Sequence, residues 1–399
     1  MNRTASSDRR RILLLAAVST VATGIALSFA FAYPWPELPY FAIDFTVFFA
    51  AARALARGLS PYDMSALEQF APAGAINAVL TYSYPPLLAQ LLAPLTAFPL
   101  ETAARLWTAF NLLAPGAAVA FLAASAGWRA RPLAWAILIL GATLFLPAVY
   151  TYLSGQASLW ILACLSLAIG LEQREHHVTA GVLAGLALVK LHPLLLLPVA
   201  FWLRDRKALL AGGVATLVSL VLAASFISGL PEAMLGAFSA NNVSMDEVLY
   251  QATPILYPPG AALAAITHLL VVGAAVAMVA WLHQRGVGWR PFWAAATAVG
   301  LLAAPYLGRS DVALALIPLT LILTAEGRLR EPKLLALLAW AVPLLAVMAY
   351  SFLALDAALL PRVWGSVTLW ITTLAALWFA FKAPTEPRSN SVSMRLADS

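Results

Sequence analysis

The sequence has little charge and almost no cysteine. Only 11% of its 399 residues are Asp, Glu, Lys or Arg, whereas 62% are hydrophobic. A soluble domain carries about 25% charged residues, so the composition excludes an ordinary soluble domain and indicates a polytopic membrane protein. The single cysteine, Cys164, excludes a disulfide framework and a cysteine metal site.

Motifs typical of soluble enzymes are also missing. The chain has no Gly-rich dinucleotide or phosphate loop and no Gly-x-Ser-x-Gly elbow, and its five histidines lack metal-binding spacing. The net charge of +6 is concentrated in short loops, so it indicates membrane topology rather than nucleic-acid affinity. Any chemistry must therefore use residues within the membrane or at its surface.

Apolar segments long enough to cross a bilayer recur along the chain. They predict about twelve helices, near 12–32, 84–98, 101–125, 132–151, 157–171, 178–202, 208–229, 258–283, 291–306, 311–325, 334–352 and 363–381. For the first segment a cleaved signal peptide is the alternative. The predicted fold is an all-α polytopic membrane domain over 1–382, followed by a disordered cytoplasmic tail at 383–399.

Basic loops orient this bundle through the positive-inside rule. The rule places five basic segments in the cytoplasm: residues 9–11, 204–207, 285–290, 328–333 and the tail after residue 382. Segments 33–83 and 230–257 then lie outside. The basic stretch at 128–131 conflicts with this scheme, because alternation of the predicted helices also places it outside.

The first outside segment, 33–83, is expected to carry interfacial helices. Residues 45–57 place apolar side chains on one helical face, with Arg53 beside it. Ser65 and Glu68 have the spacing of a capping box, which predicts a second short helix.

Asp44 lies where the first predicted span meets this outside segment. An ionisable residue at the membrane surface is a candidate functional residue. The alternative is a structural role, in which Asp44 is the N-cap of the helix that begins at Phe45. Position alone supports both roles equally.

Five segments carry a family likeness. They are DFTVFFAAARALARGLSPYD from Asp44, YSYPPLLAQLLAPL at 82–95, SGQASLWILACLSLAIGL at 154–171, AGVLAGLALVKLHPLLLLPVAFWLRDRK at 180–207 and APYLGRSDVALALIPL at 304–319. Together and in this order they resemble signatures of glycosyltransferase family 87, a branch of the GT-C membrane glycosyltransferases. The likeness spans residues 44–320.

The resemblance implies a GT-C type bundle and an inverting hexosyltransferase. In such an enzyme a sugar is presented on a polyprenyl phosphate, a carboxylate takes the proton of an acceptor hydroxyl, and the lipid phosphate leaves. By motif match that carboxylate is Asp44. The implied partners are a polyprenyl-phosphate sugar, a lipid or glycan acceptor and membrane lipids, without nucleic acid. No cofactor and no divalent metal is expected. The implied location is a bacterial plasma membrane, with the site on the periplasmic side.

Lys190 is expected to bind the carrier phosphate. It is the only Lys or Arg between Arg174 and Arg204 and lies in an apolar segment. An ammonium there costs at least about 2.5–3.5 kcal/mol, which an anionic phosphate would offset. The alternatives are an ion pair with a buried carboxylate such as Asp311, or snorkelling to the interface.

Further residues complete the predicted site. Arg309 and His192 are expected to help hold the phosphate, although a lone histidine is more often a core residue. An exposed ion pair between Arg309 and Asp311 is the alternative for these two residues. The predicted substrate-binding residues are Tyr84, Gln156, Asp311, Arg53 and Asp63.

The late motif departs from one branch of the family. The branch that mannosylates phosphatidylinositol mannosides has Ser-Trp-x-His-His where this chain has LGRSD at 307–311, so the sugar and the acceptor stay open. A lipid or sugar-lipid transporter and a non-catalytic scaffold are the alternative functions. The chain has no internal repeat of the kind transporters show. A scaffold does not require Asp44 and Lys190 in costly positions.

Overall fold

Helices form every regular element that the computed structural model describes. The described residues are 42–72, 82–227, 229–240, 261–305, 307–326, 330–353 and 360–384, together with residue 28. The predicted first span at 12–32, apart from residue 28, and the tail from residue 385 lie outside these ranges. The all-α prediction is confirmed for the described part of the chain.

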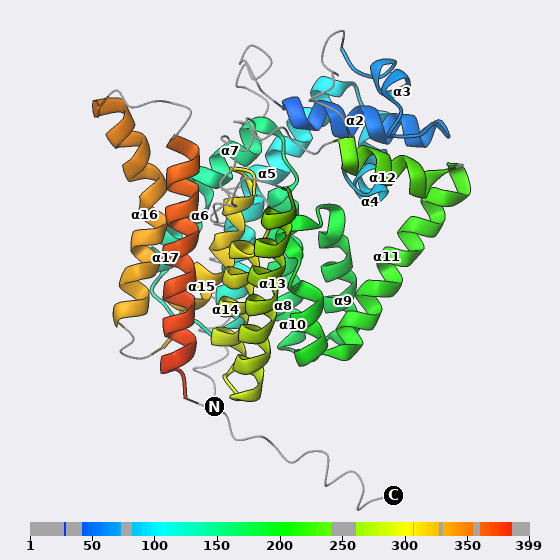
Figure 1. Ribbon diagram of the computed structural model, residues 1–399. Coiled ribbons are helices and arrows are strands. Elements are labelled where there is room, and N and C mark those ends of the chain that lie inside the picture. The colour runs from blue at the N-terminus through cyan, green and yellow to red at the C-terminus, as the bar shows by residue number, and fades with distance from the viewer. Residues whose placement is uncertain are drawn as a thin grey trace, which may run out of the picture.

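The main body is a bundle of helices that run between two ends (Figure 1). Its elements are α5 (Leu100–Ser125), α6 (Pro132–Thr143), α7 (Leu146–Ser154), α8 (Ser158–Glu172), α9 (His177–Leu186), η3 (Ala187–Val189), η4 (His192–Leu194), α10 (Leu197–Arg204), α11 (Arg206–Phe226), α13 (Ala261–Gln284), α14 (Trp289–Leu302), η6 (Asp311–Ala315), α15 (Leu316–Leu323), α16 (Arg330–Leu353) and α17 (Leu360–Lys382).

Short helices gather at one end of this bundle, the upper end in Figure 1. They are α2 (Ile43–Ala56), α3 (Met64–Glu68), α4 (Pro86–Leu92), η2 (Ala93–Ala97) and α12 (Leu230–Ala240). The predicted helix at 45–57 is therefore present as α2. Its apolar face is buried against α4 and η2, with Phe45, Phe48 and Phe49 almost without solvent exposure.

Fewer helices than predicted are long enough to cross a membrane. By length and composition, the described residues contain four such helices: Leu100–Ser125, Arg206–Ser225, Ala265–Gln284 and Trp364–Lys382. A fifth span results if α6 and α7, bent by 51° at their junction, are counted as one. Five other apolar segments are shorter helices of 10–17 residues, such as Ser158–Glu172. The described residues therefore support a helical membrane protein but not a count of twelve spans.

The conflict at 128–131 is resolved by one of these short segments. The α4–η2 segment, Pro86–Ala97, is expected to span only about 20 Å of the roughly 30 Å hydrocarbon core. The following helix, α5, starts at the same end and ends at Ser125, where the carbonyl of Ala126 accepts a hydrogen bond from the Arg290 guanidinium. Residues 128–131 thus lie at the same end as the other basic turns, and the predicted alternation was wrong there.

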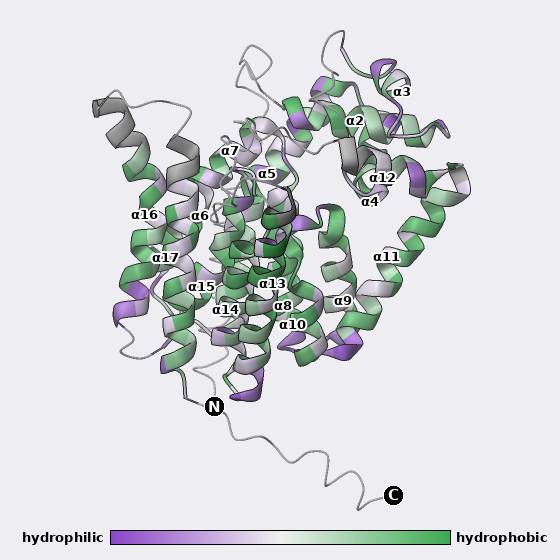
Figure 2. Ribbon diagram, in the orientation of Figure 1, coloured by the Kyte–Doolittle hydropathy of each residue, from purple (hydrophilic) through white to green (hydrophobic). Residues whose placement is uncertain are grey.

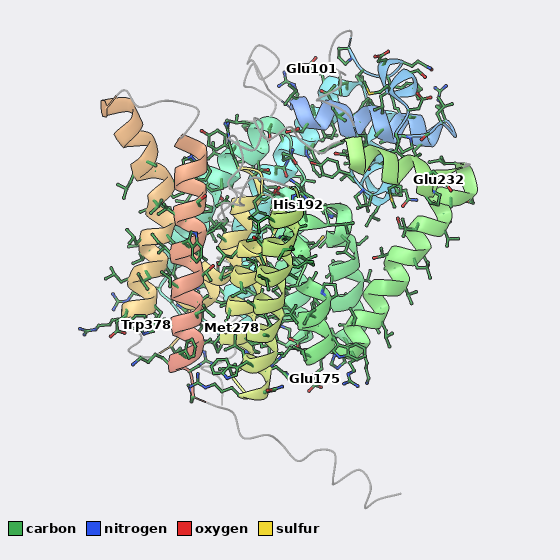
Figure 3. The ribbon with its side chains drawn as sticks, in the orientation of Figure 1. Glu101, Glu175, His192, Glu232, Met278 and Trp378 are labelled. Atoms are coloured by element: carbon green, nitrogen blue, oxygen red, sulfur yellow. The ribbon has the colours of Figure 1, made fainter. Side chains whose placement is uncertain are left out.

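Charge separates the two ends of the bundle. At the lower end in Figure 2, hydrophilic residues mark the helix termini, whereas apolar residues dominate the faces of α11, α13 and α16. Cationic side chains fasten this end: Arg285 donates to the Phe381 carbonyl at 2.9 Å, and Arg204 lies 3.7 Å from Glu172. Figure 3 places Glu175 at this end and His192 in the opposite half.

Small residues allow α9 and α11 to approach closely. A Cβ added at Gly181 would lie 2.1 Å from the backbone oxygen of Ala208, far inside van der Waals contact. Helices in a membrane gain packing where small residues let their backbones approach. Gly181 therefore fixes the distance between the two helices, whereas Gly213 on α11 has no neighbouring atom within 4 Å of such a Cβ.

Gly181→Ala is expected to destabilise the protein by about 1–3 kcal/mol, because the added methyl must push α9 away from α11. The matched control, Gly213→Ala, meets open space and should be neutral or stabilising by up to about 1 kcal/mol, since alanine favours the helix. Thermal unfolding in detergent checks the pair. Equal unfolding temperatures for the two variants would contradict the assigned close contact.

Candidate active site

Asp44 lies in the first turn of α2 and is not its cap. The N-cap is Ala42, which has a positive φ of 51° and no capping side chain. The amide of Ala42 donates to the Leu153 carbonyl of α7 at 2.8 Å, which fixes where α2 begins. The N-cap alternative for Asp44 was therefore wrong. Its carboxylate is free to face the site, and the positive end of the α2 dipole favours a negative charge there.

The turn at Gly155 and Gln156 packs directly against the start of α2. Gly155 has a φ of 78°, and a Cβ added there would lie 2.6 Å from the Cβ of Phe45. The indole Nε1 of Trp107 donates to the Gly155 carbonyl at 2.8 Å. Only glycine fits this position, because a side chain would be strained at that φ and would collide with α2. The turn therefore brings Gln156 beside Asp44.

Asp44 is partly buried among polar side chains. Burial raises the pKa of its carboxyl from 3.8 to about 6. The charge of Lys190 and hydrogen bonds from the side chains of Gln156 and Ser154 pull this pKa down, and the charge of Asp311 raises it. A carboxyl with a pKa near 6 is ionised at neutral pH and accepts a proton more readily than an ordinary aspartate.

Tyr84 connects the second predicted segment to this cluster. Its hydroxyl donates to Oε1 of Gln156 at 3.0 Å. Its ring centroid lies 5.9 Å from the Lys190 ammonium and 4.8 Å from the Phe48 ring. The hydroxyl of Tyr62 donates to the Tyr84 carbonyl at 2.9 Å and holds its backbone. The predicted residues Tyr84, Gln156 and Lys190 therefore meet beside Asp44.

Asp311 is fully buried, and one of its carboxylate oxygens accepts hydrogen bonds from two separate segments. Its exposure is 0%, and that of Lys190 is 7%. Oδ1 of Asp311 accepts from the Lys190 ammonium at 2.8 Å and from the Ser158 hydroxyl at 2.6 Å. The ion-pair alternative for Lys190 is therefore present. The exposed pair of Asp311 with Arg309 is not the arrangement found, because Asp311 is buried.

The second oxygen of Asp311 is also occupied. Oδ2 accepts from the Gly308 amide at 2.9 Å, and Nε2 of His192 lies 3.3 Å away. Arg309 lies in the same turn, with its guanidinium 5.9 Å from the Tyr150 ring centroid. Four donors thus surround one buried carboxylate, and a charge without solvent is stable only with such partners.

Arg53 and Asp63 lie among other contacts of the outer helices. The Arg53 guanidinium packs 4.9 Å from the Phe49 ring centroid. Asp63 is exposed and is the N-cap of α3, accepting from the amide and the hydroxyl of Ser65, each at 2.9 Å. The predicted capping box was therefore wrong in register, because Asp63 and not Ser65 caps this helix. No group of three or more His, Cys, Asp or Glu side chains gathers as a metal site among residues with described positions.

Ser158 and Ser154 also belong to the cluster, although the sequence did not predict either of them as a site residue. Ser158 is the first residue of α8 and donates to Asp311, while Ser154 ends α7 beside Asp44. Both flank Gln156 within the SGQAS motif, at spacings of two residues. A hydroxyl beside a recognised polar turn was the available signal, but serine is common in apolar helices and carries little information alone.

Asp311→Asn is expected to destabilise the fold by about 3–5 kcal/mol, because it removes the carboxylate that is paired with the buried Lys190 ammonium. Adding Lys190→Met should recover part of this loss. Denaturant titration in detergent measures both unfolding free energies. The control is Glu101→Gln, which breaks a 2.9 Å pair with Arg105 in which Glu101 is largely exposed; it should cost about 0.5 kcal/mol or less. Similar costs at both sites would contradict a buried ion pair.

The comparisons with known proteins agree with the segment likeness. No curated protein sequence matches the chain. A family model described as glycosyltransferase family 87 matches residues 82–308, more than half of the chain. The matched range contains Tyr84, Gln156 and Lys190, whereas Asp44 lies before it and Asp311 just after it. The chain therefore belongs to glycosyltransferase family 87.

Proposed function

We propose that the protein is an inverting hexosyltransferase that moves a mannose-like sugar from a polyprenyl phosphate to a hydroxyl of a lipid or glycan. The observation that carries this proposal is Asp44: a partly buried carboxyl with a pKa of about 6, beside the ammonium of Lys190. Family membership supports glycosyl transfer. The donor, the acceptor and the residue roles are the proposal.

Asp44 acts as the general base in this mechanism. Its carboxylate takes the proton of the acceptor hydroxyl as that oxygen forms a bond to the anomeric carbon. The bond from this carbon to the phosphate oxygen breaks, and the lipid phosphate leaves with the electron pair. Attack from the face opposite the leaving group inverts the anomeric carbon. A positioned base contributes about 10²–10⁴-fold to such a step.

Lys190 stabilises the departing phosphate. An ammonium has three donors, and one of them is directed at Asp311 at 2.8 Å. The remaining donors can reach an anion bound between Lys190 and Asp44. Preorganised cationic donors are most effective where negative charge develops on the leaving group. Arg309 and His192, which adjoin Asp311, are proposed to extend this phosphate-binding side of the site.

The active site is proposed to face the outer side of a bacterial plasma membrane. Asp44 and the short helices lie at one end of the bundle, whereas the basic turns containing Arg204, Arg285 and Arg290 lie at the other. Basic loops remain in the cytoplasm. Donor sugar and acceptor would then meet outside, at the level of the short helices α2 and α4.

Asp44→Asn is expected to reduce transfer by about 10²–10⁴-fold, because the amide cannot accept the hydroxyl proton. Purified protein in nanodiscs is given radiolabelled polyprenyl-phosphate mannose, glucose or arabinofuranose in turn, with membrane lipid extract as acceptor. Donor binding should persist in the variant. Glu101→Gln, which alters a largely exposed carboxylate paired with Arg105, is the control and should keep its activity. Transfer that survives Asp44→Asn would remove Asp44 as the base.

The pH profile of transfer tests the same base independently. Only the ionised carboxylate accepts a proton, so kcat/KM should fall as pH drops through about 6, the raised pKa of Asp44. An ordinary aspartate would give this fall near its usual value of 3.8. Initial rates measured across pH define this acidic limb of the pH–rate profile. The stability of the protein is checked at each pH. A profile that stays flat well below pH 6 would oppose the assignment.

A further inference from the structure

We propose that Gln156 is a positioning residue for the general base, which links Tyr84 to Asp44 and holds the carboxylate toward the acceptor. This inference rests on the proposed function of Asp44. Gln156 is half-buried at the turn that follows α7. Its Oε1 accepts from the Tyr84 hydroxyl at 3.0 Å. The preceding residue, Gly155, packs against Phe45 at the start of α2, which places the Gln156 side chain beside Asp44, whose pKa it lowers.

Hydrogen-bonding chemistry fixes which way the Gln156 amide points. An ionised carboxylate can only accept, so the amide nitrogen must face Asp44. The amide oxygen then faces Tyr84, whose hydroxyl donates to it. Rotating the amide by half a turn would bring its oxygen against the carboxylate and lose that bond. The relay therefore has one direction, from the tyrosine through the amide to the base.

Neighbouring residues hold both ends of this relay. The Gln156 amide of the main chain donates to the Thr151 carbonyl at 3.0 Å, and Trp107 anchors the preceding Gly155 carbonyl. Tyr84 is fixed at its carbonyl by Tyr62. Such support lets a weak contact orient a carboxylate, because little side-chain entropy remains to be lost.

Other groups around Asp44 have competing partners. The Lys190 ammonium is paired with Asp311, whose negative charge also acts on Asp44. The Ser154 hydroxyl lies 2.9 Å from the Tyr150 carbonyl of its own helix, so its single proton has an alternative acceptor. The amide of Gln156 faces no such choice, because its oxygen is used by Tyr84 and its nitrogen is left for the Asp44 carboxylate.

Infrared difference titration tests the link without turnover. An acid-minus-neutral difference spectrum is recorded for the wild type and for Asp44→Asn. Subtracting the second spectrum from the first leaves the signal of Asp44. Gln156→Met keeps the side-chain length but removes the donor, so the midpoint of Asp44 should rise by about half to one pH unit. Gln90→Met is the matched control, because Gln90 is also half-buried but pairs with Ser219 at 2.5 Å. An unchanged midpoint in Gln156→Met would overturn the proposal.

Kinetics separate positioning from the other roles that Gln156 can have. If Gln156 positions the base, Gln156→Met lowers kcat and leaves KM for the acceptor nearly unchanged. It also moves the acidic limb of the pH–rate profile to higher pH, together with the spectroscopic midpoint. A substrate-binding residue would instead raise KM with the limb fixed, and a purely structural one would lower only the unfolding temperature. Either of these results would overturn the inference.

Loss of the inference and loss of the proposed function give different results. If the wild type transfers sugar and depends on Asp44, but Gln156→Met leaves midpoint and limb unchanged, only the positioning role is wrong. If the wild type transfers none of the three sugars, the function fails, and the positioning role fails with it even where the infrared midpoint shifts. Tyr84→Phe should move the midpoint in the same direction as Gln156→Met, because it releases the amide oxygen.

Discussion

The buried carboxylate of Asp311 is the constraint on which the rest of the site depends. A charge at 0% exposure is tolerated only where donors replace water, and here they come from three separate parts of the chain. Lys190 comes from the break between η3 and η4 and His192 from the start of η4. Ser158 begins α8, and Gly308 lies in the turn before η6. Meeting this one requirement brings together segments that are far apart in sequence.

The break in the helix at Lys190 follows from the same requirement. Lys190 has extended backbone angles, φ −143° and ψ 111°, and Pro193 follows three residues later. A continuous helix would carry the ammonium past the site within apolar surroundings. The interruption instead turns the chain back toward the basic end and leaves Lys190 where Asp311 and Asp44 both feel its charge. The two apolar half-helices α9 and α10 are the structural consequence.

The sequence predicted the charged members of the candidate site, and it offered the pairing of Lys190 with Asp311 only as an alternative. Asp44 and Lys190 were predictable because ionisable residues are costly in an apolar chain and persist for a reason. The pairing of Lys190 with Asp311 joins residues 121 positions apart, which no periodicity reports. Asp311 is, however, the only acidic residue between Glu247 and Glu326, so few partners were available. The capping rule failed where two candidate residues lie close together in sequence, because Asp63 rather than Ser65 caps α3.

Membrane topology could not be read from apolar length alone. The segment near 84–98 is as apolar as a span, yet it folds as the short pair α4 and η2 packed against α2. Its shortness reverses the predicted direction of the helices from α5 to α8 and brings 128–131 to the basic end, and the break at Lys190 then returns the chain to that end at Arg204, as predicted. The apolar surface of α4 is buried against neighbouring helices, so the hydrophobicity of this segment reflects burial within the protein. A membrane span and a segment buried in protein differ in their tertiary packing. Here the packing involves Phe45 and Phe48, which belong to the same sequence signature as Asp44.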